Sequence, residues 1–255
     1  MSNQWDPKTY LAFADERTRP AAELLARVPV EAPERVVDLG CGPGNSTALL
    51  ADRWPDAHIE GIDSSPEMIR QARESGVKAE WSVADIADWT ASAPYDVVYS
   101  NAALHWVGDQ ASLLPRLMRS VRPGGALAFQ VPLNFDMPSH VLMREVAREG
   151  SWAAKLRDVR NIVLMSAEQS FDILEPYAKA LDIWETEYLQ VMEGPDAVYR
   201  WVSGTGLRPF VQALDGAERD GFVEAYKARL NAAYPMRDSG KTLFPFRRLF
   251  VVARR

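Results

Sequence analysis

The sequence has very little of the two residue types that cross-link chains or bind soft metals. Its 255 residues include one cysteine, Cys41, and three histidines, His58, His105 and His140. A single cysteine forms no intrachain disulfide or cysteine-based zinc cluster, and the histidines are too far apart for a paired helical metal motif. We therefore expect neither a disulfide framework nor a metal centre.

Long apolar runs and an excess of basic residues are also missing. No run approaches the roughly 18 apolar residues that span a bilayer, and residues 1–30 lack the pattern of a secretory signal. We expect a cytoplasmic protein that does not contact membranes. The 29 basic and 35 acidic side chains give a formal charge of −6, which argues against a nonspecific nucleic-acid binder. The sequence does not indicate an oligomeric state.

The composition is that of a globular protein, with 47% hydrophobic and 25% charged residues and no internal repeat. Short β-rich runs alternate with helical ones in the first half of the chain. Strands joined by helices of this length run parallel, because each right-handed crossover returns the chain to the same edge. We predict a doubly wound, mostly parallel α/β sheet, with strands at 35–39, 58–63, 79–83, 95–99 and 126–131 and helices at 45–54, from 66 and at 110–121.

The alternation weakens after Pro132. Two further strands at 184–192 and 248–253 complete a predicted sheet of seven strands. The stripe Phe222, Val223, Tyr226 and Leu230 recurs at helical spacing and predicts core packing. We read the remaining segments as a helical cap over the carboxyl edge of the sheet, with helices at 139–149, 168–180, 196–201 and 217–233.

A glycine loop at residues 38–47 (DLGCGPGNST) carries the strongest chemical signal. Glycines there let the backbone approach a ligand at the sheet edge where open α/β folds bind. A dinucleotide fingerprint needs glycine or alanine where Asn45 stands. Asp38 would repel a pyrophosphate and attract an ammonium group. These two residues argue against a nicotinamide dehydrogenase and for a ligand with a cationic end.

Two more aspartates follow successive predicted strands. Asp63 can accept hydrogen bonds from both hydroxyls of a ribose. Asp85 offers a carboxylate for an exocyclic amine, beside the apolar surface of Ile86. Each aspartate alone is commonly a turn residue. Three at successive strand ends fit a nucleoside with an amino-acid tail, for which S-adenosyl-L-methionine is the obvious candidate.

The glycine loop and three further stretches, at residues 61–68, 84–86 and 122–125, resemble motifs of the class I S-adenosylmethionine-dependent methyltransferases. The resemblance covers about residues 36–131. The resemblance implies a Rossmann-like methyltransferase fold. It implies that Asp38 and the glycines hold the methionine part, Asp63 the ribose, Met68 the adenine face, and Asp85 with Ile86 the adenine edge. The predicted cofactor residues are Asp38, Gly40, Gly42, Asn45, Asp63, Ser64, Met68, Asp85, Ile86 and Asn101.

Stretches outside this core resemble one subfamily, the bacterial trans-aconitate 2-methyltransferases. They lie at residues 5–10, 16–20, 101–106, 140–146, 205–209 and 248–255. The resemblance implies transfer of a methyl group to a carboxylate of a small polycarboxylate. From the length and the pattern of elements we predict a single domain over 1–255, divided into an N-terminal helical lid (1–30), a cofactor core (31–133), a helical cap interrupted by one strand (134–246) and a last strand (247–255).

A carboxylate acceptor has a reference pKa near 4 and is ionised at pH 7, so it needs no general base. The site must grip the acid and align it for in-line displacement, and arginine forks suit carboxylates. The cations outside the cofactor loops are Arg17, Arg19, Arg144, Arg208, Lys241, Arg247 and Arg248. We predict that Arg208, which Trp201 and Phe210 flank, binds the acid together with Arg17, Arg19 and Arg144. The alternative for each arginine is a solvated surface charge.

Three further side chains are candidates near the methyl group. Tyr10 and His105 are the catalytic candidates, because each can hydrogen-bond an acceptor carboxylate; the alternative is that each only packs against its neighbours. We expect Trp106 to form a wall of the substrate site and Cys41 to pack within the turn.

Two other functions remain open: methylation of a different small molecule, natural product or nucleic-acid base, and a nonenzymatic regulator that binds the cofactor. Because the total charge is negative, recognition of an anionic acid must come from a few local arginines.

Overall fold

The computed structural model describes residues 14–159 and 165–255. It divides into two compact units. The first, the sheet unit, comprises the described residues of Met1–Pro132, Leu164–Thr186 and Arg248–Arg255, and the second, the helical unit, those of Leu133–Val163 and Glu187–Arg247. Tyr10 and the first thirteen residues of the predicted lid lie outside the described residues, and so does the side chain of Arg17.

The seven strands form one sheet in the order β3-β2-β1-β4-β5-β7-β6. Neighbouring pairs among β1 to β5 are parallel, and β7 is antiparallel to β5. The prediction of a mostly parallel seven-stranded sheet is confirmed. The strands are β1 (Arg35–Leu39), β2 (His58–Asp63), β3 (Glu80–Val83), β4 (Tyr95–Asn101), β5 (Val121–Pro132), β6 (Ala180–Glu193) and β7 (Lys241–Arg254).

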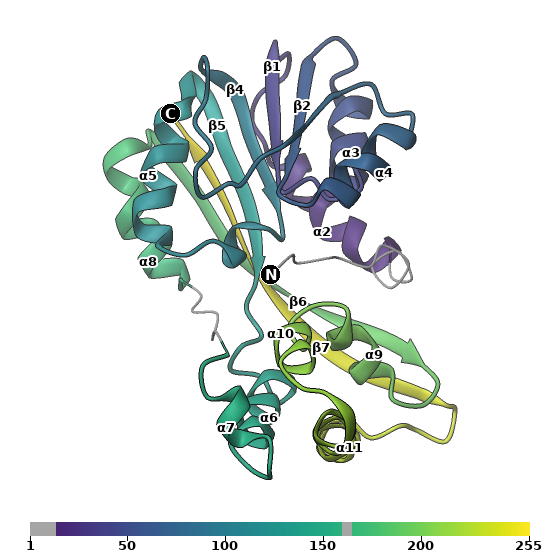
Figure 1. Ribbon diagram of the computed structural model, residues 1–255. Coiled ribbons are helices and arrows are strands. Elements are labelled where there is room, and N and C mark those ends of the chain that lie inside the picture. The colour runs from purple at the N-terminus through teal and green to yellow at the C-terminus, as the bar shows by residue number, and fades with distance from the viewer. Residues whose placement is uncertain (1–13, 160–164) are drawn as a thin grey trace. The chain divides into compact units, whose positions relative to one another are not determined.

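Helices cover both faces of the sheet unit. Helices α3 (Asn45–Arg53) and α4 (Pro66–Glu74) lie on one side of the strands, and α5 (Gln110–Ser120) and α8 (Ala167–Leu174) lie on the other (Figure 1). The central strand β4 is buried along almost its whole length, as expected for a parallel strand covered on both faces. Helix α2 (Ala14–Ala26) is tied to it, because the hydroxyl of Tyr99 donates to the carbonyl of Ala21 at 2.7 Å.

The start of α4 shows why the chain turns into a helix after β2. Ser65 is the N-cap, its hydroxyl accepts from the N–H of Met68, and Pro66 occupies the first turn. Serine satisfies an otherwise unpaired helix N–H, and proline loses nothing there because that position needs no donor. The helix predicted from residue 66 is confirmed.

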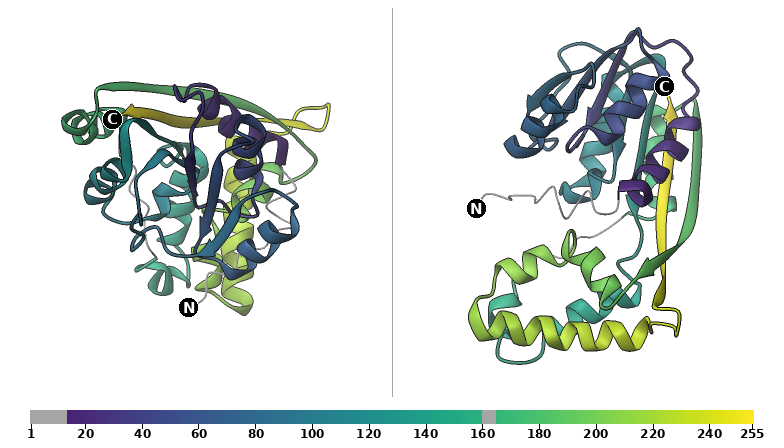
Figure 2. Two further views of the ribbon diagram at one scale, coloured as in Figure 1. Left: turned by 90° about the horizontal axis from the view of Figure 1, so that it is seen from above. Right: turned by 90° about the vertical axis from the view of Figure 1, so that its right-hand side faces the viewer.

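The helical unit contains α6 (Pro138–Ala147), α7 (Ala153–Leu156), α9 (Ala197–Ser203), α10 (Arg208–Gln212) and α11 (Gly216–Ala233). Helix α11 is its long helix (Figure 2). The predicted stripe is confirmed at Phe222, Tyr226 and Leu230, which are buried. The hydroxyl of Tyr226 donates to the carbonyl of Ser139 at 2.6 Å and so links α11 to α6.

Some predicted boundaries were wrong. The helix predicted over 168–180 ends at Leu174, is followed by the short η2 (Glu175–Tyr177), and gives way to β6 at Ala180. Pro176 explains the early end, because proline has no N–H for the helical ladder and its ring clashes with the preceding turn. The last two strands are longer than predicted, beginning at Ala180 and Lys241. The strand predicted over 126–131 begins earlier, because residues 121–125 are also part of β5, where its register with β4 is irregular.

Candidate functional site

Asp38 lies in β1 and is fully buried. Its Oδ2 accepts hydrogen bonds from the hydroxyls of Ser46 and Thr47, both at 2.7 Å. Its Oδ1 is buried and has no hydrogen-bond partner among the described residues. Burial raises the pKa of Asp38 to about 6, although the two hydroxyls act in the opposite direction. A carboxylate oxygen in this state lacks the cationic partner that would stabilise its charge, so Asp38 fits the ammonium group of an amino-acid tail.

The glycine loop that follows has a backbone that only glycine adopts easily. Gly40, Gly42 and Gly44 all have positive φ, at 75°, 56° and 97°. A Cβ on Gly42 would meet nothing within 4 Å, so the backbone here borders open space. The N–H groups of Gly40 and Cys41 both donate to the carbonyl of Ile62, which holds the start of the loop against the end of β2. The predicted burial of Cys41 within this turn is confirmed.

Asp63 at the end of β2 connects the glycine loop to the start of α4. Its Oδ2 accepts the N–H of Gly42 at 3.0 Å, and its Oδ1 accepts the N–H of Ser65 at 2.8 Å. Burial raises the pKa of Asp63, and these two N–H groups partly oppose the change. Each oxygen keeps a lone pair for a further donor, so the carboxylate can still accept ribose hydroxyls. Ser64 is exposed beside it, and Asn45 is the first residue of α3.

Gly40 brings three predicted parts of the site together. A Cβ at this position would lie 2.2 Å from Cβ of Ala103 and 3.5 Å from Cδ1 of Ile86. The loops after β1, β3 and β4 therefore meet at this glycine. Ile86 is buried, whereas Asp85 is exposed and accepts the N–H of Ala87. Met68, on α4, is buried.

A chain of polar side chains supports Asn101 at the end of β4. Gln130, opposite Asn101 in the parallel register with β5, donates from Nε2 to Oδ1 of Asn101 at 2.5 Å. The guanidinium of Arg248 donates to Oε1 of Gln130 at 3.1 Å. Gln130 and Arg248 are both buried. The amide of Asn101 therefore has a fixed orientation.

His105 and Trp106 belong to the short η1 (Leu104–Trp106) just beyond Asn101. His105 is buried, Trp106 is half-buried, and their ring centroids are 4.9 Å apart. Because Ala103 contacts Gly40, the same turn holds these two rings near the glycine loop.

The predicted acid-binding arginines lie in different surroundings. Arg19 is exposed and pairs with Glu23 at 2.7 Å within α2. In the helical unit, Arg144 on α6 is half-buried, and its guanidinium donates to the carbonyl of Phe135 at 2.6 Å. Burial lowers the pKa of Arg144, and the positive charge of Arg148 lowers it further. Arg208, the first residue of α10, is half-buried.

Several residues that support the site escaped the sequence analysis. Trp81 on β3 packs its ring where a Cβ on Gly61 would lie, 2.4 Å away, and it also contacts Gly44. A glycine inside a strand, such as Gly61, indicates a close approach by a neighbouring group, so the sequence contained a signal for this contact. Arg116 on α5 donates to the carbonyls of Ile86 and Trp89 and fixes the loop after β3. Nothing in the local sequence marks that contact.

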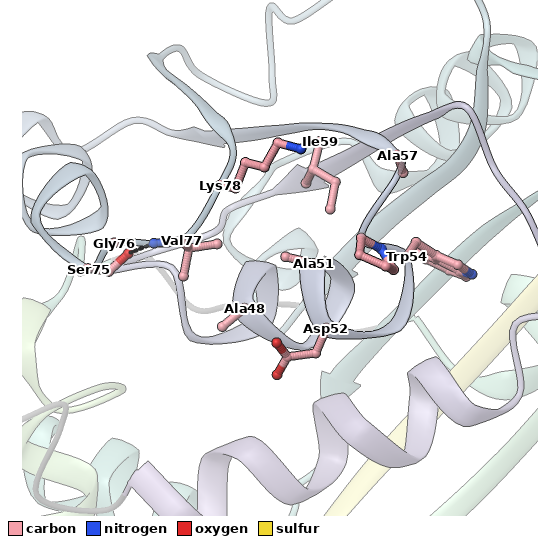
Figure 3. A pocket seen from close by; sticks show the side chains of 11 residues that line it. Ala48, Ala51, Asp52, Trp54, Ala57, Ile59, Ser75, Gly76, Val77 and Lys78 are labelled. Carbon is pink, nitrogen blue, oxygen red and sulfur yellow. Dashed lines mark hydrogen bonds between the residues drawn. The ribbon is translucent and has the colours of Figure 1, made fainter.

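A cavity of about 360 Å³ lies elsewhere in the sheet unit, between α3 and the turn that follows α4 (Figure 3). Small and apolar side chains line most of it, with Asp52 and Lys78 as the charged groups. None of the predicted cofactor residues lines it. Among the described residues, no cluster of His, Cys, Asp or Glu could hold a metal ion. No helix in the same part of the chain is long and apolar enough to cross a membrane.

Comparisons with known proteins agree with this geometry. A family described as "Methyltransferase domain" matches residues 36–125. The trans-aconitate 2-methyltransferase of Azoarcus sp. (strain BH72) is 52% identical over 98% of each chain. The trans-aconitate 2-methyltransferase of Paracidovorax citrulli is 50% identical over 99% of each chain.

Solved structures with little sequence identity share the fold. The YcgJ protein of Bacillus subtilis aligns with a TM-score of 0.61 at 14% identity, over 93% of this chain and 99% of that one. Phosphoethanolamine N-methyltransferase 2 of Haemonchus contortus, in complex with S-adenosyl-L-methionine, aligns with a TM-score of 0.53 at 18% identity, over 92% of this chain and 52% of that one. The fold, the glycine loop with its aspartates and the full-length relatives lead to one conclusion: the chain belongs to the trans-aconitate 2-methyltransferase family, whose members are S-adenosylmethionine-dependent enzymes.

Proposed function

We propose that this enzyme methylates one carboxylate of trans-aconitate, or of a closely related small polycarboxylate, to form a monomethyl ester. The proposal is supported most directly by the relatives named for this activity, which are 50–52% identical to this chain over nearly its full length. Bound S-adenosyl-L-methionine supplies an electrophilic methyl group on its sulfonium.

The cofactor residues have separate tasks in this proposal. Asp38 binds the ammonium group through the oxygen that no described residue satisfies. Asp63 accepts the ribose hydroxyls while its carboxylate also fixes the N–H groups of Gly42 and Ser65. Ile86 and Met68 contact the adenine, and Asp85 accepts its amine. Gly40, Gly42, Asn45, Ser64 and Asn101 complete this set.

The acid needs orientation rather than deprotonation. Its carboxylates are ionised at neutral pH, so the protein's task is to hold one oxygen in line with the methyl group, roughly 3–3.5 Å away. Arg208 and Arg144 are the best placed of the predicted cations for this task, because both are half-buried. A partly desolvated guanidinium binds a carboxylate more strongly than an exposed one such as Arg19. Arg17, Tyr10, His105 and Trp106 remain proposed contributors.

The activity itself is tested by incubating the purified chain with methyl-labelled S-adenosyl-L-methionine and trans-aconitate. We expect a base-labile monomethyl ester in the product. A panel of other polycarboxylates, phenols and amines measures selectivity. If the label goes to a phenol or an amine and not to any polycarboxylate, the enzyme is a methyltransferase of different specificity.

The role of Arg208 is tested by Arg208→Ala. Loss of a charge-assisted hydrogen bond to the acid is expected to raise the KM for trans-aconitate by about 10- to 100-fold. The affinity for S-adenosylhomocysteine, measured by calorimetry, should not change. Arg219→Ala, on the exposed surface of α11, is the matched control. An equal loss of acid and cofactor affinity in Arg208→Ala would show that the residue acts on the fold of the site.

A further inference from the structure

A second cavity, of about 300 Å³, lies within the helical unit, and three arginines line it. Arg144 is on α6, Arg148 is the C-cap residue of that helix, and Arg157 follows α7 directly. The other walls are apolar and include Ala147, Leu156 and Phe210. We call this site the arginine cavity.

The three guanidinium groups have no ion-pair partner among the described residues. Within residues 14–159 and 165–255, none of Arg144, Arg148 and Arg157 forms an ion pair with an aspartate or glutamate. Three acidic residues of the same region form ion pairs with other arginines. Glu145 on α6 and Glu149 just beyond its end both pair with Arg229, and Asp136 pairs with Arg247. No ion pair within the described chain therefore neutralises the arginines of the cavity.

Such an arrangement carries an energetic cost unless an anion is present. Burial and the positive charge of Arg148 lower the pKa of Arg144, and the charges of Asp136 and Glu145 oppose this change only in part. Arg144 is half-buried beside apolar walls, which reduces the solvent screening of its interaction with a bound anion, whereas Arg148 and Arg157 are exposed.

We infer that the arginine cavity is a binding site for a small polycarboxylate, contacted by Arg144, Arg148 and Arg157. Three planar guanidinium groups match two or three carboxylates, and the apolar wall matches the carbon skeleton that joins them. A volume of about 300 Å³ is within the usual range for a small-molecule site. The choice of a polycarboxylate as the ligand rests on the proposed function. The grouping of three arginines is observed within the helical unit and does not depend on that proposal.

The test measures binding of tricarballylate, a saturated tricarboxylate, to the full chain saturated with S-adenosylhomocysteine. Arg148→Gln and Arg157→Gln suit this test because both side chains are exposed, so folding should be preserved. Each variant should weaken binding by about 3- to 10-fold, the range for a partly solvated charge contact. Arg219→Gln removes an equal charge outside the cavity and should leave binding unchanged. Unchanged affinity in both cavity variants would overturn the inference.

A second measurement locates the ligand. Tricarballylate should protect Arg148 and Arg157, but not Arg219, from phenylglyoxal, as mapped by mass spectrometry. Inorganic phosphate and butyrate should protect them at least tenfold less well at equal concentration; equal protection by phosphate would overturn the assignment to a polycarboxylate. Because neither measurement requires turnover, failure of methyl transfer to trans-aconitate would count against the proposed function and not against this site.

Discussion

Replacing Asp38 with asparagine is predicted to stabilise the cofactor-free protein while it abolishes tight cofactor binding. The carboxylate is fully buried, Ser46 and Thr47 satisfy one oxygen, and the other oxygen has no partner among the described residues. In Asp38→Asn, the amide oxygen can still accept both hydroxyls. The variant therefore removes a buried charge and keeps the local hydrogen bonds.

The magnitude follows from the pKa of Asp38, about 6 in the folded chain against 3.8 for the unperturbed group. This difference corresponds to ~3 kcal/mol by which the ionised carboxylate destabilises the folded state. The penalty is complete above pH 6, decreases as the pH falls and vanishes below 3.8. Asparagine places an amide N–H group where Oδ1 lies, which costs ~1–2 kcal/mol. The expected net gain at pH 7.5 is thus ~1–2 kcal/mol, or a Tm higher by about 2–6 °C.

Thermal unfolding of the cofactor-free protein from pH 5 to 8 measures this effect, and calorimetry measures the affinity for S-adenosylhomocysteine. The Tm difference between variant and wild type should shrink toward pH 5, and the affinity should fall by about 100-fold or more, because one member of a buried charge pair is lost. Asp96→Asn is the matched control. Asp96 is also buried, but it accepts the N–H groups of Glu34 and Arg35 and pairs with Arg122. This control should lower the Tm and leave cofactor affinity unchanged. If Asp38→Asn lowers the Tm at pH 7.5 as the control does, or binds the ligand as wild type does, the reasoning is refuted.

Two further predictions concern the backbone of the loop and a buried histidine. Gly40→Ala should lower the free energy of unfolding by about 2–4 kcal/mol in chemical denaturation, because its Cβ would lie 2.2 Å from that of Ala103 at a φ of 75°. Gly76→Ala, with a φ of 78° and no atom within 4 Å of its Cβ, should cost only about 1 kcal/mol, and equal losses would contradict the steric argument. Burial, with the charge of Arg144, lowers the pKa of His140 to about 4 from 6.5, so wild-type stability is complete above pH 6.5 and is lost as the pH falls toward 4. In His140→Gln, the loss of unfolding free energy between pH 6.5 and pH 4 should be smaller by about 3 kcal/mol, so the Tm should fall less steeply with pH. Parallel Tm profiles of variant and wild type would refute the lowered pKa of His140.

The sequence predicted most accurately those features that depend on a few neighbouring residues. Ser65 and Pro66 start α4 because capping and proline geometry are local, and the stripe Phe222, Tyr226 and Leu230 is buried because its spacing follows the helical repeat. The prediction of a helix through Pro176 is wrong because proline interrupts the helical hydrogen bonds, so α8 ends at Leu174. This signal is also local, but the helical periodicity of the segment obscured it. Parallel strands in the first half follow from chain connectivity, which the order of elements already contains.

The sequence by itself therefore determined the sheet, the glycine loop and the three aspartates at the ends of strands, since local conformation and connectivity specify them. Only the tertiary structure decided the state of each charged group. Asp38 has a buried oxygen without a partner among the described residues, and its pKa is raised, because the protein around it excludes water. Arg144, Arg148 and Arg157 share a cavity, whereas the neighbouring acids Glu145 and Glu149 pair with Arg229 on α11. Desolvation and ion pairing depend on residues far apart in the chain, so no local pattern specifies them.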